Sequence, residues 1–139
     1  MDMQDILLVE DDIDDIYFFL EAIKAIDPKI NVNFLKDGSE LMDWLKTTPS
    51  IHSSLIFLDL STPKFDGRQV LKTLHDNKII NLICLVVYTT SSNPKDIKYA
   101  AEMGAKSYIV KPDTIKDLKA KLETTIKYWF TVNHEPLPF

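Results

Sequence analysis

The sequence predicts an α/β protein built on a parallel five-stranded sheet with helices on both faces, a doubly wound arrangement. The first observation is that short apolar runs alternate with amphipathic segments five times along the 139 residues. Such alternation is typical of parallel sheets joined by crossover helices. The second is that residues 6–9 and 55–58 are apolar at every position, as expected of strands buried on both faces. Because right-handed crossovers are nearly obligatory and this order is common for five units, we expect the strand order 2-1-3-4-5.

The first two strand and helix units follow from their hydrophobic periods. Residues 6–9 form the first expected strand, and a helix is expected from Asp14 to Pro28, with acids in its first turn, where the helix dipole favours them. Residues 30–34 alternate apolar side chains with asparagines, which predicts a strand at a sheet edge. A second helix is expected after Gly38. The inward residues of these elements are expected to be Ile16, Phe19, Leu20, Ile23, Ile30, Val32, Phe34, Leu41, Trp44 and Leu45.

The third and fourth units follow the same pattern. Residues 55–58 are the third expected strand, and a helix follows Gly67. Its inward residues are expected to be Val70, Leu71 and Leu74. Residues 82–87 form a fourth apolar run. The next helix is expected from Asn93 to Gly104, because glycine tolerates the left-handed backbone that often ends a helix.

The fifth unit closes the sheet. Residues 108–110 are the last expected strand, and either Asp113 or Thr114 can cap the last helix. The apolar stripe of that helix comprises Ile115, Leu118, Leu122, Ile126 and Trp129. Trp129 can finish the core or form a dimer contact, and the spacing favours the core.

Composition indicates one globular domain. Hydrophobic residues make up 45% of the chain and charged residues 27%, which is typical of soluble proteins. We assign residues 1–130 to this domain and 131–139, which have no periodicity, to a short C-terminal tail. The net charge of −5 and a single arginine argue against nucleic acid binding. Cys84 is the only cysteine and the amino terminus resembles no signal peptide, so we expect a cytoplasmic protein without a membrane span.

Reactive side chains follow four of the five expected strands. Glu10 and Asp11 come after the first strand, Asp59 after the third, Thr89 after the fourth and Lys111 after the fifth. Asp59 alone is explained equally well as the start of a turn. Together, however, these residues are expected at one edge, because the carboxyl ends of parallel strands line one crevice. Three carboxylates there would repel one another unless a cation lay among them, and Mg²⁺ prefers such oxygen ligands.

A cation beside a carboxylate, a hydroxyl and an ammonium suits phosphoryl transfer. Asp59 is the predicted nucleophile, which attacks phosphorus in line and becomes an acyl phosphate. Mg²⁺ and Lys111 are expected to neutralise the phosphoryl oxygens. Thr89 and the backbone amide of Thr90 are expected to donate hydrogen bonds to the remaining oxygen.

These residues resemble the motifs of receiver domains in two-component response regulators, of the single-domain chemotaxis-regulator type. The motifs are Glu10-Asp11, Asp59 with Pro63 and Asp66-Gly67, Thr89, Tyr108 and Lys111-Pro112. The resemblance covers nearly the whole chain and implies the flavodoxin-like form of the α/β fold. The hydroxyl-rich run 89–92 and the aromatic end of the last helix resemble the subgroup that works with phytochrome-type sensor kinases.

The resemblance implies a role for each motif. It implies that Asp59 is the phosphoacceptor, helped by Thr89 and Lys111. It implies that Mg²⁺ is held by Glu10, Asp11, Asp59 and the backbone carbonyl of Ser61. It also implies a cis bond between Lys111 and Pro112, and a switch in which Thr89 and Tyr108 move together. For Tyr108, a static interfacial tyrosine explains the sequence equally well.

The resemblance also implies how the protein would act. It is expected not to be an enzyme in the ordinary sense, although it would catalyse its own phosphorylation and slow dephosphorylation. The donor would be a sensor histidine kinase or a histidine phosphotransfer protein, and the output would be contact with a downstream protein. Neither nucleic acid nor a membrane is an expected partner. A homodimer through the fourth helix, fifth strand and last helix is compatible with the pattern.

Three positions depart from the usual family pattern. Ser61-Thr62 replaces the commoner residues before Pro63, which leaves the phosphate lifetime open. Glu10 stands where aspartate is commoner, and its longer side chain is expected to reach the metal only through water. Asp12 adds a further acid, which we interpret as a helix cap or a solvated charge.

Two other classes fit less well. Phosphatases of the haloacid dehalogenase type also use Asp, Thr and Lys at strand ends with Mg²⁺, but they place the nucleophile on the first strand and need an Asp two residues after it. This chain has its candidate nucleophile on the third strand and Ser61 at the later position. A flavodoxin-like cofactor module needs a hydroxyl- or glycine-rich phosphate loop after the first strand, where this chain carries acids instead.

Overall fold

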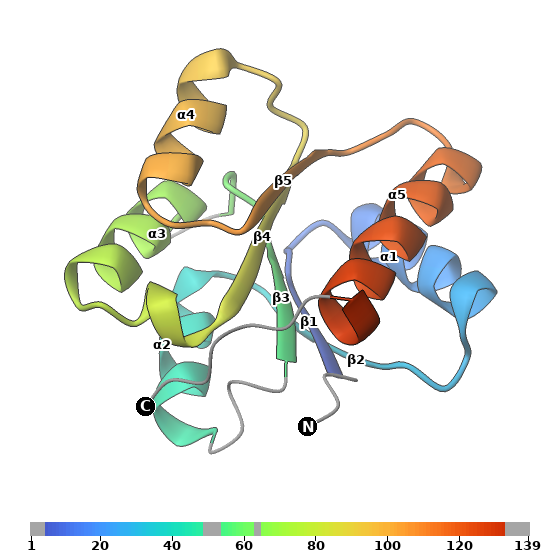
Figure 1. Ribbon diagram of the computed structural model, residues 1–139, viewed down its shortest axis with the longest axis horizontal. Helices are drawn as coiled ribbons and strands as arrows, with labels where there is room; N and C mark the ends of the chain where they lie inside the picture. Colours follow the sequence, from blue (N-terminus) through green and yellow to red (C-terminus); the bar gives the residue numbers. More distant parts are fainter. Residues whose placement is uncertain (1–4, 49–53, 63–64, 133–139) are drawn as a thin grey trace.

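The fold is a parallel sheet in the predicted order. The computed structural model describes residues 5–48, 54–62 and 65–132, and in these ranges the five strands are arranged β2-β1-β3-β4-β5. The strands are β1 (Asp5–Val9), β2 (Asn31–Leu35), β3 (Ser54–Leu58), β4 (Cys84–Thr89) and β5 (Ser107–Val110). The doubly wound, flavodoxin-like α/β fold is therefore confirmed (Figure 1).

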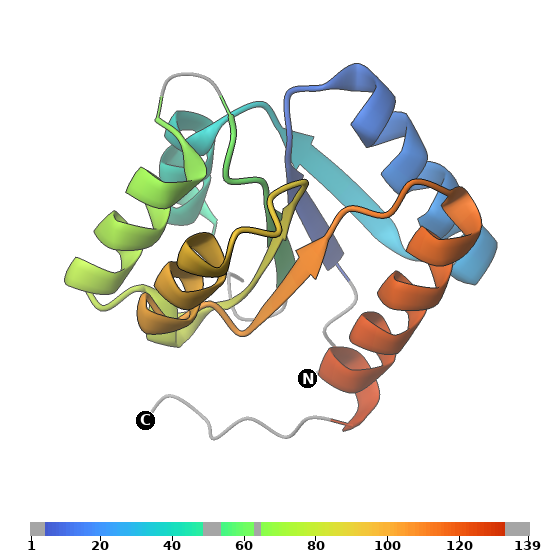
Figure 2. The same ribbon diagram turned by 90° about the horizontal axis from the view of Figure 1, so that it is seen from above.

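Five α-helices cover both faces of the sheet within the described ranges. They are α1 (Ile13–Ile26), α2 (Gly38–Thr47), α3 (Gly67–Asp76), α4 (Pro94–Glu102) and α5 (Ile115–Lys127). Helices α1 and α5 lie on one face, and α2, α3 and α4 lie on the other (Figures 1 and 2). In the part of the chain that the structure describes, no helix combines the length and apolar character needed to cross a membrane.

Two hydrophobic cores result from the alternation of side chains along the buried strands. In β3, Leu55 and Phe57 face the α1 and α5 side, whereas Ile56 and Leu58 face the α2, α3 and α4 side. All five residues of β3 are buried, which explains why the sequence shows an unbroken apolar run there. On the α1 side the rings of Phe19, Phe57 and Tyr88 contact one another edge to face.

Polar caps set where the helices begin. Asp12 caps α1 by accepting a hydrogen bond from the amide of Asp15, so its interpretation as a helix cap is confirmed. Asn93 caps α4, and Gly104 follows that helix with a φ of 98°, as its position predicted. Of the two candidates for capping α5, Thr114 makes the contact.

Three details of the apolar pattern were predicted wrongly. Ile115, expected on the apolar stripe of the last helix, is the first residue of α5 and is 36% exposed. Leu82 is not the start of β4 but ends a 3-10 turn (Ile80–Leu82) and is 41% exposed, because a run of apolar residues does not reveal where a buried strand begins. Phe34, expected to point inward, is 51% exposed. It lies on the edge strand β2, where burial depends on how far neighbouring helices reach.

Helical backbone reaches the residues where the C-terminal tail is predicted to begin. Helix α5 passes directly into a π-helical turn (Tyr128–Val132), so helical backbone continues past residue 130. Trp129 packs against the core on the α1 and α5 side, which agrees with its assignment to the core. The rest of the predicted tail, residues 133–139, lies outside the described residues.

Candidate functional site

Strand register brings the predicted site residues to one edge of the sheet. The amide of Asp59 donates to the carbonyl of Val9 over 3.2 Å, which places the end of β3 beside the end of β1. The amide of Lys111 donates to the carbonyl of Thr89 over 2.7 Å, which does the same for β5 and β4. The residues that follow or end these strands therefore share one edge, as expected for parallel strands.

Lys111 is the centre of this edge. Its Nζ lies 2.5 Å from Oε1 of Glu10, 2.7 Å from Oδ2 of Asp15 and 3.1 Å from Oδ2 of Asp59. The side chains of Lys111 and Asp59 are each 7% exposed and that of Glu10 is 1% exposed, whereas that of Asp15 is 37% exposed. A buried ammonium thus contacts three carboxylates, which come from the loops after β1 and β3 and from the first turn of α1.

Burial and charge shift the ionisation of this group. Burial, assisted by the nearby charge of Asp59, raises the pKa of Glu10 to about 7, although the hydrogen bond from Lys111 opposes the shift. Burial alone would lower the pKa of Lys111, but its hydrogen bonds to Asp15 and Glu10 outweigh this effect and raise that pKa. One ammonium among three carboxylates leaves an excess of negative charge, so the site would favour a further cation.

An aromatic ring and a small pocket border Lys111. Its Nζ lies 5.2 Å from the centroid of the Tyr88 ring, within the range of a cation–π contact. Tyr88, Phe18, Thr90 and Pro112 contribute to the wall of a pocket of about 260 Å³ that reaches Lys111. Through this pocket a small molecule in solvent can reach the ammonium of Lys111, next to the carboxyl ends of the strands.

Two hydroxyls at this end of the sheet are buried without a hydrogen-bond partner in the described part of the chain. Thr89 at the end of β4 is fully buried, and Thr62 in the loop after β3 is 6% exposed. Neither side-chain oxygen has a hydrogen-bond partner among the described residues. Such groups are rare because burying a hydroxyl without a partner costs free energy, so the Thr89 hydroxyl is available to a bound group.

The loop after Asp59 packs closely against α3. The amide of Gly67 donates to the carbonyl of Leu60 over 3.1 Å. A Cβ atom at residue 67 would lie 2.4 Å from the carbonyl oxygen of Asp59, too close for any side chain. Glycine at this position therefore lets the helix begin directly behind the candidate phosphoacceptor. Pro63, which carries part of the family resemblance, lies outside the described residues.

The four predicted metal ligands are only partly brought together. Glu10 and Asp59 meet at Lys111, Asp11 is exposed, and the backbone amide of Ser61 donates to Oδ1 of Asp59 over 3.1 Å. Within residues 5–48, 54–62 and 65–132, no three Asp, Glu, His or Cys side chains are arranged to hold a metal ion. Mg²⁺, however, needs only one or two carboxylates and keeps several waters. The buried carboxylates of Glu10 and Asp59 are therefore suitable ligands for it. The full ligand set stays a prediction.

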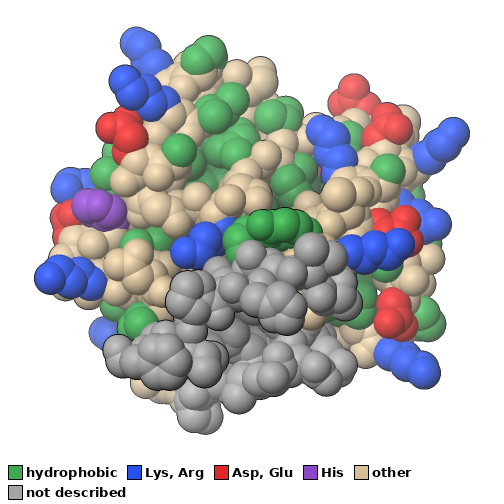
Figure 3. All heavy atoms as spheres, viewed as in Figure 1, with side chains coloured by type: hydrophobic (Ala, Val, Ile, Leu, Met, Phe, Trp, Pro, Cys, Tyr) green, Lys and Arg blue, Asp and Glu red, His purple; other side chains and the backbone are tan. Residues whose placement is uncertain are grey.

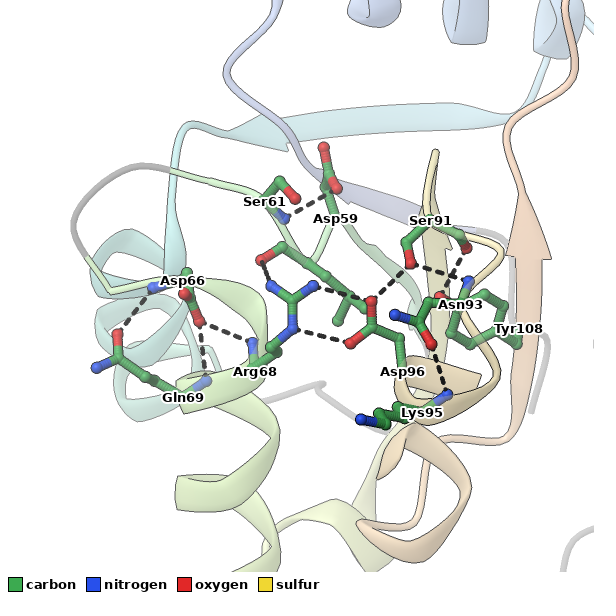
Figure 4. Close-up of polar contacts among 11 residues, drawn as sticks. Asp59, Ser61, Asp66, Arg68, Gln69, Ser91, Asn93, Lys95, Asp96 and Tyr108 are labelled. Atoms are coloured by element: carbon green, nitrogen blue, oxygen red, sulfur yellow. Dashed lines mark hydrogen bonds and ion pairs between the residues drawn. The ribbon is translucent and has the colours of Figure 1, made fainter. Parts of the chain in front are cut away.

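A second polar cluster joins α3 to α4 next to this edge (Figure 4). The guanidinium of Arg68 binds the carboxylate of Asp96 with two hydrogen bonds of 3.0 and 2.9 Å. Ser91 donates to the same carboxylate over 2.6 Å. Arg68 first, and Ser91 second, hold the pKa of Asp96 below its ordinary value. Arg68 also donates to the carbonyl of Leu60 over 3.5 Å, next to Asp59.

Tyr108 takes part in this second cluster. Its hydroxyl donates to the carbonyl of Ser91 over 2.8 Å, and its side chain is partly buried (Figure 4). The predicted movement of Tyr108 with Thr89 stays a prediction. The implied cis bond between Lys111 and Pro112 is wrong for this structure, in which the bond is trans, the form that most such bonds take.

Three residues of these clusters were not predicted as site residues. Asp15 was placed only among the acids of the first helical turn, and Arg68 and Asp96 were not singled out. The contacts of Arg68 with Asp96 and of Asp15 with Lys111 join residues that are distant in the sequence. The sequence carried no usable signal for Asp15, because its contact with Lys111 depends on how α1 is oriented relative to β5.

Comparison with known proteins identifies the family of the chain. A family model for the response regulator receiver domain matches residues 6–123. The chain is 32% identical over 136 residues to the probable methanogenesis regulatory protein FilR2 of Methanothrix harundinacea (strain 6Ac), which covers 96% of this chain and 88% of that protein. It is 34% identical over 128 residues to the response regulator Rcp1 of Synechocystis sp. (strain ATCC 27184 / PCC 6803 / Kazusa), covering 89% and 87%.

Solved structures show the same likeness across the whole fold. The crystal structure of the Mn²⁺-bound form of Rcp1 matches with a TM-score of 0.79 and 32% identity, over 96% of this chain and 99% of that one. The crystal structure of the phosphorylated cyanobacterial phytochrome response regulator RcpA matches with a TM-score of 0.83 and 29% identity, over the same shares. With the family model matching most of its length, this chain belongs to the response regulator receiver domain family.

Proposed function

We propose that this protein is a phosphoryl-accepting switch of a two-component pathway, a response regulator with Asp59 as the acceptor. The observation that carries the proposal is the contact of 3.1 Å between the buried carboxylate of Asp59 and the ammonium of Lys111. The buried hydroxyl of Thr89, which has no hydrogen-bond partner among the described residues, ends the neighbouring strand β4. That RcpA has been crystallised as a phosphorylated protein supports the same chemistry here.

The reaction follows from the positions of these groups. A carboxylate oxygen of Asp59 attacks the phosphorus atom of the donor; a new oxygen–phosphorus bond forms while the bond to the donor atom breaks, and its electron pair leaves with the donor. Lys111 then donates to a phosphoryl oxygen instead of to Asp59. The hydroxyl of Thr89 donates to a second oxygen.

A divalent cation, Mg²⁺ in this proposal, would supply positive charge to the phosphoryl oxygens when bound. Glu10, Asp11, Asp59 and the carbonyl of Ser61 would hold it. The Mn²⁺-bound form of Rcp1 supports a divalent cation, and so does the excess of negative charge around Lys111.

The partners are proposed from the family and from the surface. The donor is a sensor histidine kinase or a histidine phosphotransfer protein, and the likeness to the phytochrome response regulator RcpA favours a phytochrome-type kinase. The output is contact with a downstream protein through α4, β5 and α5, where a homodimer would also form. Figure 3 shows hydrophobic side chains gathered over α4 and β5, and Ile97 of α4 is 39% exposed.

The switch is proposed to connect the phosphoryl group to that surface. Thr89 would move toward a phosphoryl oxygen, and Tyr108 would leave the carbonyl of Ser91, which its hydroxyl now contacts over 2.8 Å. Phosphorylation would thereby shift the populations of two pre-existing states of this surface.

Intact mass spectrometry tests the proposal. The purified protein is incubated with Mg²⁺ and acetyl phosphate and then weighed. We expect one added phosphoryl group that is labile to base and absent in Asp59→Asn. The control is Asp43→Asn, which makes the same change in charge on the exposed side of α2 and should leave the adduct in place. An unmodified wild type, or an adduct that survives Asp59→Asn, would overturn the proposal.

A further inference from the structure

A carboxylate outside the predicted site shares the ammonium of Lys111. Oδ2 of Asp15 lies 2.7 Å from Nζ, closer than the 3.1 Å of Asp59. Asp15 belongs to the first turn of α1, whereas Lys111 follows β5. Asp15 and Lys111 are distant in the sequence, so the local structure of α1 alone does not explain their contact.

Helix capping does not explain this contact. Asp15 is the third residue of α1, the position from which a side chain often reaches back to the cap. In α3 the equivalent residue, Gln69, does so by accepting from the amide of Asp66 over 3.1 Å. In α1 the cap is made by Asp12, which accepts from the amide of Asp15 over 3.1 Å. The carboxylate of Asp15 is directed to Lys111 instead.

The donors of Lys111 show what this carboxylate does. A lysine ammonium has three N–H donors, and here three carboxylates accept from it. Glu10 and Asp15 form the two shorter contacts, of 2.5 and 2.7 Å, and Asp59 forms the longest. Two anchors leave the third donor directed at Asp59, where a phosphoryl oxygen can replace the carboxylate oxygen.

We propose that Asp15 is a positioning residue that holds the ammonium of Lys111 against the phosphoryl-accepting carboxylate. The inference rests on the proposed function of Asp59. Without Asp15, the ammonium keeps Glu10 as its one anchor besides the acceptor itself, and its free donor no longer has a fixed direction. Because a displacement of about 1 Å at a reacting centre can cost as much as about a hundredfold in rate, phosphorylation should slow.

Positioning and simple electrostatics predict opposite effects. Asp15 adds a negative charge near the site, and an anionic phosphodonor is repelled by it. If charge were its whole effect, removing Asp15 would speed phosphorylation. If Asp15 holds Lys111, removing it slows phosphorylation. The sign of the change therefore separates the two roles.

The test is the initial rate of phosphoryl incorporation from acetyl phosphate in Asp15→Asn. We expect this rate to fall by about tenfold or more relative to wild type. The matched control is Asp12→Asn, which removes one charge from the same helix end while its amide oxygen still caps α1; its rate should stay within about twofold of wild type. Asp15→Ala serves as a second variant, since alanine favours the helix.

A second readout follows Lys111 itself. The labelling of lysines by an amine-specific reagent, located by peptide mass spectrometry, should rise severalfold at Lys111 in Asp15→Asn and stay unchanged at exposed Lys24 of the same helix. Because Lys24 is already exposed, its labelling controls for the dose and reactivity of the reagent.

The outcomes are distinguishable from a failure of the proposed function. If the wild type gains no phosphoryl group, the proposed function fails. If the wild type is modified but Asp15→Asn matches Asp12→Asn or reacts faster, or if labelling of Lys111 does not change, the positioning role of Asp15 is overturned while the phosphoacceptor stands.

Discussion

At the scale of single residues, Lys111 explains how three acids coexist at one strand edge. Its ammonium is shared by Glu10, Asp15 and Asp59, and this sharing offsets part of their mutual repulsion. One ammonium does not balance three carboxylates. Burial first, and the proximity of Asp59 second, raise the pKa of Glu10 to about 7. A site with unmet negative charge and an unpartnered hydroxyl is suited to receive a cation and a phosphoryl group, although both features cost stability in the resting protein.

Thr89 offers a test of this conflict between stability and function. Its buried hydroxyl has no partner among the described residues, so Thr89→Val removes a desolvation cost and should raise the free energy of unfolding by about 1 kcal/mol. The same change should slow phosphoryl incorporation, because the hydroxyl is the proposed donor to a phosphoryl oxygen. Urea unfolding and the acetyl phosphate assay measure the two effects.

The control for Thr89→Val is Thr125→Val. The hydroxyl of Thr125 donates to the carbonyl of Lys121 over 2.8 Å on α5, away from the site, so its loss should bring no gain in stability and no change in phosphorylation. A Thr89→Val protein that unfolds at lower urea than wild type would show that the Thr89 hydroxyl is satisfied after all.

At the scale of elements, Arg68 and Asp96 tie α3 to α4. Two hydrogen bonds join the guanidinium to the carboxylate, and Ser91 connects this pair to Tyr108. Arg68 also contacts the carbonyl of Leu60 over 3.5 Å, directly after the acceptor. The loop that follows Asp59 and the start of α4 are thus linked through one arginine, the only one in the chain.

The pH dependence of stability tests this link. Arg68 first, and Ser91 second, lower the pKa of Asp96 below its ordinary value of 3.8. Since the folded state favours the ionised carboxylate, the pair stabilises the fold above that ordinary value, and this stability is lost as the pH falls through the lowered pKa. Urea unfolding should therefore show Asp96→Asn less stable than wild type at neutral pH, with the difference shrinking in strong acid.

The control for Asp96 is Asp76→Asn, whose partner Lys72 forms an exposed ion pair. Such pairs contribute little, so this variant should follow the wild type across the whole pH range. A constant difference between Asp96→Asn and wild type from neutral to strongly acidic pH would contradict the assigned ion pair.

At the scale of the whole molecule, the sequence predicted the strand order and the edge where the site lies, but not the side-chain contacts made by the helices. Residues 55–58 are apolar throughout and bounded by turn-forming residues, which favours a strand covered on both faces, and β3 is buried at every position. The meeting of Asp59 and Lys111 followed from parallel strands ending at one edge. The contact of Lys111 with Asp15 did not follow, because it depends on the orientation of α1 relative to β5. The start of β4 also escaped prediction, since Leu82 continues the apolar run while lying in a turn.

The central claim is that Asp59 itself carries the phosphoryl group. Reduction of the phosphorylated protein with borohydride converts an acyl phosphate to an alcohol at the residue that carried it, and peptide mass spectrometry then locates that residue. The account predicts that the alcohol appears at residue 59 and at no other acid of the site. An alcohol at Glu10, Asp11 or Asp15, with residue 59 unchanged, would contradict it.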